Sequence, residues 1–345
     1  PASRSRACYN PTPNRPGWFR VDIAGKDGMR KLQRHLAALV GLAALIGVAT
    51  PSMADVSDLI DRLNNHNSIK GSESTKGWRV LFDAYLKLSK PPQAVGASFN
   101  IETIWPGMPG WSEVSDWAEA NPGMGQAIIE ASQRTIIGLP YGIDNVPATY
   151  EQKGVYIEIW SKGNVRNNRF EYLSALGEIL AYSTAETYRL FEVGKSAEAI
   201  DLAVAQLWLL RKFCDRDFLE EKRVCMELMI ASLENMRDCF WSYADRISAD
   251  QFRHVAKQEI PYLRTDRRRL AIPEADKIVA SEIFDQVFDD STGEADAQQF
   301  VEVFTEIQAE QEPLGRFGAA QRWAELSYSH GGLPATQERL TNIFD

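Results

Sequence analysis

The side chains in this sequence that could do chemistry are mainly carboxylates, and they form no catalytic motif. Neighbouring acids occur at Glu220 and Glu221 and again at Asp289 and Asp290. Two carboxyl groups can cleave a glycosidic bond when they face each other across about 5 to 10 Å. Adjacent residues of a helix point in different directions, so spacing alone gives neither pair this role. We therefore assign no catalytic residue.

Patterns for metals and cofactors are also sparse. The acidic segment 289–294 could bind calcium weakly, although a solvated acidic turn is the simpler interpretation. His66, His254 and His330 are widely separated, as surface or capping histidines usually are. The sequence contains no nucleophile elbow, no HExxH, no phosphate-binding glycine loop and no EF-hand loop. We expect no metal and no cofactor.

Three cysteines, Cys214, Cys225 and Cys239, follow residue 200. An oxidising compartment could join Cys214 to Cys225, which flank a short polar turn. If Cys225 lies two helical turns into its helix, its Cα is beyond the limit of about 7 Å for a disulfide. We favour three buried thiols and leave the pairing open. The spacing is not that of a C-x-x-C metal site.

Tryptophans are concentrated in one region, at Trp78, Trp105, Trp111 and Trp117. Exposed tryptophans can stack on sugars or hold a partner peptide. Trp78 lies on an apolar helix face and is expected in the core. Trp105 and Trp111 flank Pro106-Gly-Met-Pro-Gly, where packing constrains them less. They are our candidates for binding a partner.

The stretch 170–243 predicts the long helices that organise the chain. Apolar residues recur there at three- and four-residue intervals, which an α-helix places on one side. Gly194 followed by Ser196 predicts a tight turn between two antiparallel helices. Asp217 and Glu220 have the spacing of a capping box, so a third helix is expected to start near Phe218.

The segment Tyr188-Arg-Leu-Phe-Glu-Val-Gly-Lys-Ser-Ala-Glu-Ala-Ile resembles the middle of a tetratricopeptide repeat. The resemblance covers about one repeat, and no second copy follows at about 34 residues. Asp215-Arg-Asp stands where that family usually has a proline. The resemblance implies helical hairpins whose concave surface binds peptides or proteins. We expect an all-α fold, an irregular array of helical hairpins that is TPR-like or α-solenoid-like.

A second resemblance lies upstream, in Trp111-Ser-Glu-Val-Ser-Asp-Trp-Ala-Glu-Ala-Asn-Pro, Ile128-Ile-Glu-Ala-Ser-Gln and Gly138-Leu-Pro-Tyr. Together with the long hairpin, these segments are similar to a group of uncharacterised secreted bacterial helical proteins. The resemblance implies a fold and a compartment, and it brings no activity.

The N-terminal region has the pattern of an exported protein. Residues 1–28 are expected to be upstream or fragment sequence and to be disordered. Residues 29–54 read as a signal peptide, with a basic start, the apolar run 36–48 and small residues before a cleavage point after Ala54. The apolar run is short for a membrane span, so we expect no stable span after cleavage; an uncleaved anchor is the alternative.

Three further regions follow the signal peptide. Residues 55–137 predict an N-terminal helical region. Residues 138–165 are rich in proline and glycine and contain one alternating run, 154–160, that could be a short strand or an extended lid. Residues 166–345 predict the helical-hairpin core, and the pattern is still helical where the sequence stops, as in a truncated chain.

Charge narrows the possible functions. The chain has 38 basic and 47 acidic residues, of which eight basic and two acidic ones fall within 1–54. Residues 55–345 therefore contain 30 basic and 45 acidic residues and carry a net charge of −15. Such a chain repels nucleic-acid phosphates and anionic lipid. One remaining function is an exported scaffold that binds a protein or peptide in the periplasm, at the cell surface or outside the cell. The other is an exported polysaccharide hydrolase, a helical toroid with paired carboxylates at its mouth. We favour the scaffold, and thus a protein that is not an enzyme.

Overall fold

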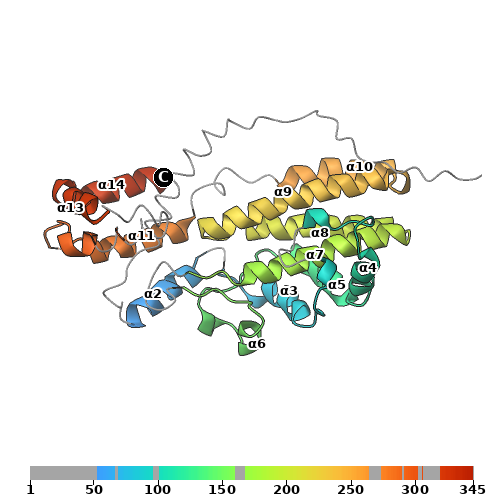
Figure 1. Cartoon of the computed structure of the whole chain (residues 1–345), viewed down its shortest axis with the longest axis horizontal. Helices are drawn as coiled ribbons and strands as arrows, with labels where there is room; N and C mark the ends of the chain where they lie inside the picture. The colour runs from blue at the N-terminus through green and yellow to red at the C-terminus, as the bar shows by residue number, and fades with distance from the viewer. Residues whose placement is uncertain are drawn as a thin grey trace, which may run out of the picture. The chain divides into compact units, whose positions relative to one another are not determined.

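Three long helices form the centre of the fold: α7 (Tyr172–Glu192), α8 (Ser196–Phe213) and α9 (Leu219–Ser242). In the computed structural model they lie side by side, and each packs on the other two (Figure 1). Residues 179–188 of α7 are all buried, polar ones included. A helix that is buried around its whole circumference belongs to a core. The prediction of three helices across 170–243 is confirmed.

The turn between α7 and α8 is as short as the sequence predicts. Gly194 adopts φ +82°, a left-handed conformation that glycine accepts without strain. The amide N–H of Lys195 donates to the carbonyl of Leu190 at 2.8 Å and so satisfies one of the last carbonyls of α7. A turn of this length makes α7 and α8 antiparallel neighbours.

The structure describes residues 53–66, 69–95, 101–159, 168–263, 273–289, 291–301, 305 and 319–344. These fall within the larger of the two units into which the chain divides, Val40–Asp345. The remaining α-helices are α2 (Met53–Asn64), α3 (Trp78–Tyr85), α4 (Trp111–Glu119), α5 (Pro122–Gln133), α6 (Ala148–Glu151), α10 (Ala249–His254), α11 (Glu274–Val287), α13 (Ala319–Ser329) and α14 (Gly332–Phe344). Short helical turns are η1 (Glu73–Thr75), η2 (Gln93–Val95), η3 (Ile101–Thr103), η4 (Ile143–Asn145), η7 (Ala244–Arg246), the π-helical η8 (Val255–Glu259) and η9 (Ile260–Leu263).

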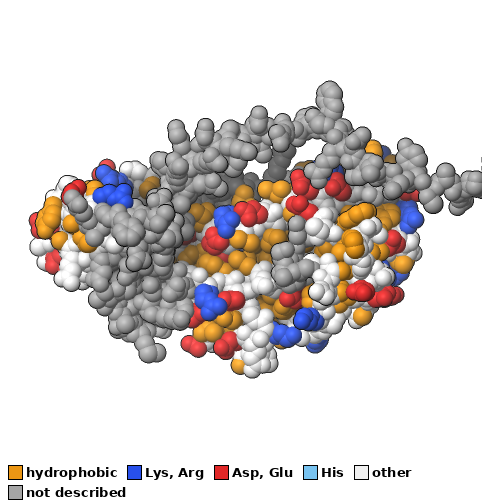
Figure 2. Space-filling view, viewed as in Figure 1, with side chains coloured by type: hydrophobic (Ala, Val, Ile, Leu, Met, Phe, Trp, Pro, Cys, Tyr) orange, Lys and Arg blue, Asp and Glu red, His pale blue; other side chains and the backbone are white. Residues whose placement is uncertain are grey.

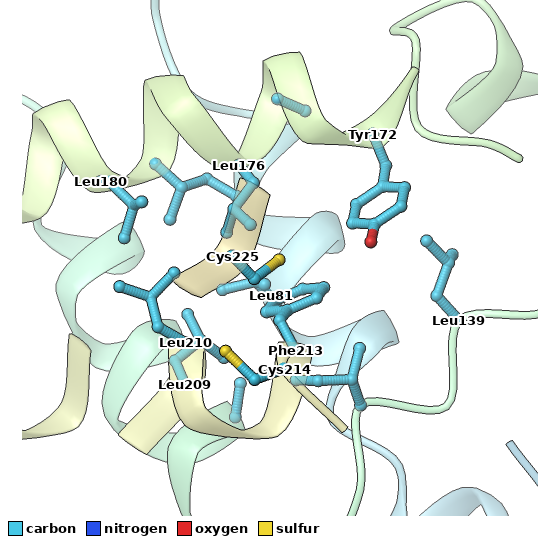
Figure 3. Close-up of a cluster of buried hydrophobic side chains, with 14 of the residues drawn as sticks. Leu81, Leu139, Tyr172, Leu176, Leu180, Leu209, Leu210, Phe213, Cys214 and Cys225 are labelled. Atoms are coloured by element: carbon cyan, nitrogen blue, oxygen red, sulfur yellow. The ribbon is translucent and has the colours of Figure 1, made fainter. Parts of the chain in front are cut away.

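The shorter helices pack around the central three. Helix α5 contacts α3, α7 and α8, whereas α4 contacts α7. Figure 3 shows Leu81 of α3, Leu176 of α7, Leu210 of α8 and Cys225 of α9 in one apolar cluster, and all four are buried. Trp78 is buried, as its position on an apolar face predicts.

The described residues contain isolated β-bridges and no strand, so the fold there is all-α. In the alternating run 154–160, of which the structure describes 154–159, Val155 and Ile157 are buried. Its described residues form one β-bridge, an antiparallel one between Glu158 and Arg169. One bridge is too little for a sheet, which needs neighbouring strands to be stable.

Two of the predicted regions extend beyond the residues that the structure describes. The signal peptide, 29–54, lies outside them except for Met53 and Ala54, which form the first turn of α2. The predicted helical-hairpin core, 166–345, also includes residues outside them, namely 166–167, 264–272, 290, 302–304, 306–318 and 345. Among the described helices, none is both long enough and apolar enough to cross a bilayer.

Candidate functional site

A buried ion pair lies where α8 turns into α9. Arg216 Nε donates to Glu221 Oε1 at 2.8 Å, and both side chains are almost completely inaccessible to solvent. The hydroxyl of Tyr172 donates to the same carboxylate oxygen at 2.8 Å, and that of Tyr141 donates to the other at 2.7 Å. Arg216 Nη1 donates to the carbonyl of Leu139 at 2.5 Å. The pair thereby joins the loop before η4 to α7 and α9.

The surroundings of Arg216 favour its charged form. Burial alone would lower the pKa of Arg216, but the Glu221 carboxylate raises it above its ordinary value. Burial, reinforced by that carboxylate, raises the pKa values of Tyr141 and Tyr172 well above 10, so both hydroxyls remain donors. The guanidinium also lies 4.4 Å from the centre of the Tyr141 ring, a cation–π contact. These groups are enclosed, and they connect the loop before η4 to α7 and α9.

A second polar group surrounds the start of α9 and joins it to α2 and α11. The Asp217 carboxylate lies 2.6 Å from His66 Nδ1, in the geometry of an ion pair rather than an aligned hydrogen bond. The amide N–H of Leu219 donates to Asp276 Oδ2 at 2.7 Å, and that of Ala275 donates to the Asp217 carbonyl at 3.2 Å. We name His66, Asp217 and Asp276 the α9 collar.

Two groups of the α9 collar, His66 and Asp276, have raised pKa values. Contact with Asp217 raises the pKa of His66 despite its partial burial. Burial raises the pKa of Asp276 to about 7, with a further contribution from Glu221 and Asp217 and an opposing one from the Leu219 N–H. Both groups favour their protonated forms in the folded protein.

The predicted capping box of Asp217 and Glu220 is wrong. Phe218 occupies the N-cap position of α9, and its side chain makes no capping hydrogen bond. Glu220 instead pairs with Arg223 on the surface at 2.7 Å. Asp276 of α11 accepts the Leu219 N–H, so a distant residue replaces the local cap.

Of the other candidate pairs for chemistry, the structure separates Glu220 from Glu221, and Asp290 lies outside the described residues. Glu221 is enclosed, whereas Glu220 lies at the surface, so these neighbours do not face a common space. Asp289 accepts hydrogen bonds from the amides of Ser291 and Thr292 at 2.8 Å, as in an acidic turn. Among the described residues, no group of three or more His, Cys, Asp or Glu side chains is placed to hold a metal ion.

The three cysteines are buried free thiols. Burial raises the pKa of Cys214 to about 11 and that of Cys239 to about 12, and it raises the pKa of Cys225 well above 9. Figure 3 places Cys214 and Cys225 in the apolar cluster of the core. A thiol that stays protonated is a poor nucleophile, so these residues pack rather than react.

The candidate binding surface lies on residues 101–111, which we name the tryptophan loop. This loop contacts the C-terminal halves of α7 and α9, at the end opposite the Arg216–Glu221 pair. The Asn235 side chain of α9 donates to the Ile101 carbonyl at 2.8 Å and fixes one end of the loop. At the other end, Trp111 Nε1 donates to Glu192 Oε2 of α7 at 3.0 Å. The loop therefore bridges the C-terminal halves of two core helices.

The two predicted tryptophans differ in accessibility. Trp105 is 51% exposed. Its ring lies against Gly107, where a Cβ would come within 1.8 Å of the ring. Trp111 is half-buried, with its ring 6.3 Å from that of Tyr188 in an edge-on contact. Trp105 therefore presents the larger surface, and Trp111 anchors the loop.

An aromatic layer lies beneath this end of the helices. The Tyr243 ring is 6.3 Å from Tyr188 and stacks on Phe191 at 5.0 Å. Two other exposed apolar residues mark the ends of the same helices, Val193 at 55% and Trp241 at 85% exposed. Figure 2 shows hydrophobic side chains mixed with Asp and Glu on the face over the central helices.

A small cavity lies between α7, α8 and α9. Its volume is about 20 Å³, and its lining includes Thr184, Thr187, Gln206, Ser232 and Asn235. Gln206 Nε2 donates to the Ser232 hydroxyl at 2.8 Å across this region. A space of this size holds about one water molecule. It is too small for a substrate.

No protein family, no curated protein and no solved structure matches this chain.

Sequence reasoning missed the Arg216–Glu221 pair, its two tyrosines and the α9 collar. Arg216 stood in a turn that interrupted the helical pattern, and an arginine in a turn is usually solvated. The one available signal was Glu221, which falls on the buried side of α9 four residues before Cys225. A charged residue on an apolar face needs a partner.

Proposed function

We propose that this protein is an exported helical scaffold, without enzymatic activity, that binds another protein through the tryptophan loop. The observation that carries the proposal is Trp105, half exposed on a loop whose two ends are tied to α9 and α7. An aromatic side chain held in place before binding loses little conformational entropy when a partner covers it. Exposed tryptophans are frequent anchors of protein interfaces.

The helices around the loop support a repeat-like scaffold. The α7–α8 hairpin has the short glycine turn of the resemblance, and α9 packs against both helices. In this proposal the hairpin and α9 form a TPR-like unit, and the tryptophan loop lies across its open end. The stable helices hold the loop, and the loop carries recognition.

The hydrolase alternative needs two carboxylates that face each other beside a tryptophan. Glu192 contacts Trp111, but its carboxylate accepts the indole N–H at an exposed position. Glu221 lies at the opposite end of α9, with both oxygens hydrogen-bonded by tyrosines. This arrangement supports recognition by the loop better than glycoside cleavage.

Affinity capture tests the proposal. The tagged protein is expressed in its own cells and recovered from the exported fraction, and co-purifying proteins are quantified by mass spectrometry. The Trp105→Ala variant is compared with Tyr328→Ala, because Tyr328 is an 84% exposed aromatic on α13. We expect a partner in stoichiometric amount with wild type and with Tyr328→Ala, and its loss with Trp105→Ala.

A partner retained by Trp105→Ala, or no partner at all, would count against the proposal. A glycan array then tests the alternative, since selective glycan binding that depends on Trp105 would favour a polysaccharide substrate. Export is tested separately by mass spectrometry of the exported form, whose N-terminus is expected at Asp55.

A further inference from the structure

The stretch of sequence between Lys90 and Arg134, which includes the tryptophan loop, contains acidic residues and no basic ones. The acids in this interval are Glu102, Glu113, Asp116, Glu119 and Glu130. Three of them are exposed on α4 at three-residue intervals, so they share one side of that helix. Helix α4 begins at Trp111, the residue that ends the loop. An acidic ridge therefore continues directly from the aromatic anchor.

The neighbouring helices add further acids beside the loop. Glu192 at the end of α7 is exposed and touches Trp111. On α9, Glu234, Asp238 and Trp241 share one exposed side. The exposed Arg237 lies on the same side and pairs with Asp238 at 2.8 Å. Trp111, at the end of the tryptophan loop, and Trp241 thus each have carboxylates nearby.

Two basic side chains at this end, Arg189 and Arg246, have negative or carbonyl partners, whereas Lys87 and Lys90 are exposed beside Ser89, whose carbonyl accepts the Trp117 indole N–H of α4. Arg189 binds the Glu186 carboxylate at 2.7 Å and lies 3.5 Å from Glu119. Arg246 Nη1 donates to the carbonyl of Phe191 and, at 3.3 Å, to that of Glu192. Glu119 is therefore partly compensated by Arg189, whereas Glu113 and Asp116 supply the negative charge on α4 that an approaching molecule meets.

Resting on the proposed function, we propose that the partner of the tryptophan loop is a cationic protein segment, rich in Lys or Arg, with an apolar side chain that packs on Trp105. Nucleic acid and anionic lipid share the sign of the acidic ridge and are repelled. A second copy of this chain is disfavoured for the same reason, because the whole chain carries a net charge of −9. A basic segment gains both the attraction of the ridge and the apolar contact.

The test measures binding of two fluorescein-labelled peptides of 18 residues to the full chain by fluorescence anisotropy. One peptide contains Lys, Leu and Ala in an amphipathic helical pattern, and the other has Glu in place of every Lys. The charge variant is Glu113→Gln with Asp116→Asn. Its matched control is Asp144→Asn with Glu151→Gln, which removes the same charge from exposed acids that follow Tyr141, at the opposite end of α9. Trp105→Ala removes the apolar contact, and circular dichroism verifies that each variant is folded.

We expect the Lys peptide to bind and the Glu peptide not to bind. The α4 charge variant is expected to raise the Kd of the Lys peptide about three- to tenfold, as the loss of two exposed charge interactions would. The control pair should change the Kd less than twofold, and Trp105→Ala should raise it at least as much as the α4 variant. Raising the salt concentration should weaken binding to wild type and have less effect on the α4 variant.

The outcomes separate this inference from the function on which it rests. Equal weakening by both charge pairs would show general attraction to an acidic chain and would overturn the inference. Equal binding of the two peptides would overturn it as well. If Trp105→Ala loses the captured cellular partner while the α4 variant keeps it, the loop is an interaction site and the cationic partner is refuted. If neither variant affects capture or peptide binding, both proposals fail.

Discussion

Replacing Glu221 with glutamine should destabilise the protein strongly, although the side chain keeps its shape. The substitution leaves Arg216 charged, buried and without its carboxylate. It also removes a charged acceptor that two tyrosine hydroxyls share, at 2.7 and 2.8 Å. Breaking one partner of a buried ion pair typically costs about 3 to 5 kcal/mol. Since domains are stable by only about 5 to 15 kcal/mol, the variant should lose a large part of its stability.

Urea unfolding at pH 7, followed by circular dichroism and tryptophan fluorescence, measures this loss. Arg216→Met should cost a similar amount, because it leaves the Glu221 carboxylate buried without its counter-charge. The double variant Arg216→Met with Glu221→Gln should be less destabilised than the sum of the two singles, since neither buried charge remains. The difference is the coupling energy of the pair, expected at about 2 kcal/mol or more.

A loss below about 1 kcal/mol in either single variant would refute this reasoning, because a surface ion pair contributes that little. Additive single effects would refute it too, since independent sites show no coupling. The matched surface control is Arg223→Met, whose partners Glu220 and Glu227 are exposed. It should change the free energy of unfolding by less than about 1 kcal/mol.

Three other predictions follow from the described contacts. Because the pKa of Asp276 is raised, protonated Asp276 stabilises the fold fully below about pH 4, and this contribution is lost as pH rises through about 7. Asp276→Asn should therefore reduce the loss of stability between pH 5 and pH 8, as measured by urea titrations. An unchanged pH dependence would contradict this prediction. Gly107→Ala should displace the Trp105 ring and weaken Lys-peptide binding while changing unfolding by less than about 1 kcal/mol, because the displaced ring is an exposed side chain. Iodoacetamide should label Cys225 and Cys239 only in denaturant, as read by peptide mass spectrometry, and rapid labelling in native buffer would show that the thiols are accessible.

The long helices could be predicted because their signals are local. Helical spacing of apolar residues gives α7, α8 and α9, and Gly194 gives the turn between the first two. The start of α10 is equally local: Ser248 and Gln251 satisfy each other's backbone amides in a capping box, as their spacing suggests. In each case the groups that interact lie within a few residues of one another.

The start of α9 could not be predicted in detail because its partners are distant in sequence. The same spacing that forms a cap at Ser248 does not form one at Asp217, since Asp276, 57 residues after Leu219, takes the amide. Glu221 meets tyrosines 80 and 49 residues before it. The pattern of a single sequence does not show which distant side chains come together in the fold. Polar contacts between separate elements therefore cannot be predicted from it.

For the tryptophan loop, sequence reasoning gave the candidates, and packing decides between them. Trp105 and Trp111 have equivalent surroundings in the sequence, each beside the Pro106–Gly110 turn. Only the contact of Trp111 with Glu192 and Tyr188 distinguishes an anchor from an exposed ring. Exposure depends on what lies opposite a side chain, and a linear pattern cannot show it.

Helix α9 links the two regions that carry these arguments. Its first turn is held by the buried Arg216–Glu221 pair, and its C-terminal half holds the tryptophan loop through Asn235. A buried ion pair adds little net stability over apolar packing, because desolvation offsets most of its attraction. Its directional hydrogen bonds, however, are satisfied in one arrangement of α7 against α9, since Tyr172 belongs to α7 and Glu221 to α9. The same two helices hold the ends of the tryptophan loop, through Asn235 of α9 and Glu192 of α7, so both the buried pair and the supports of this loop depend on how α7 and α9 pack.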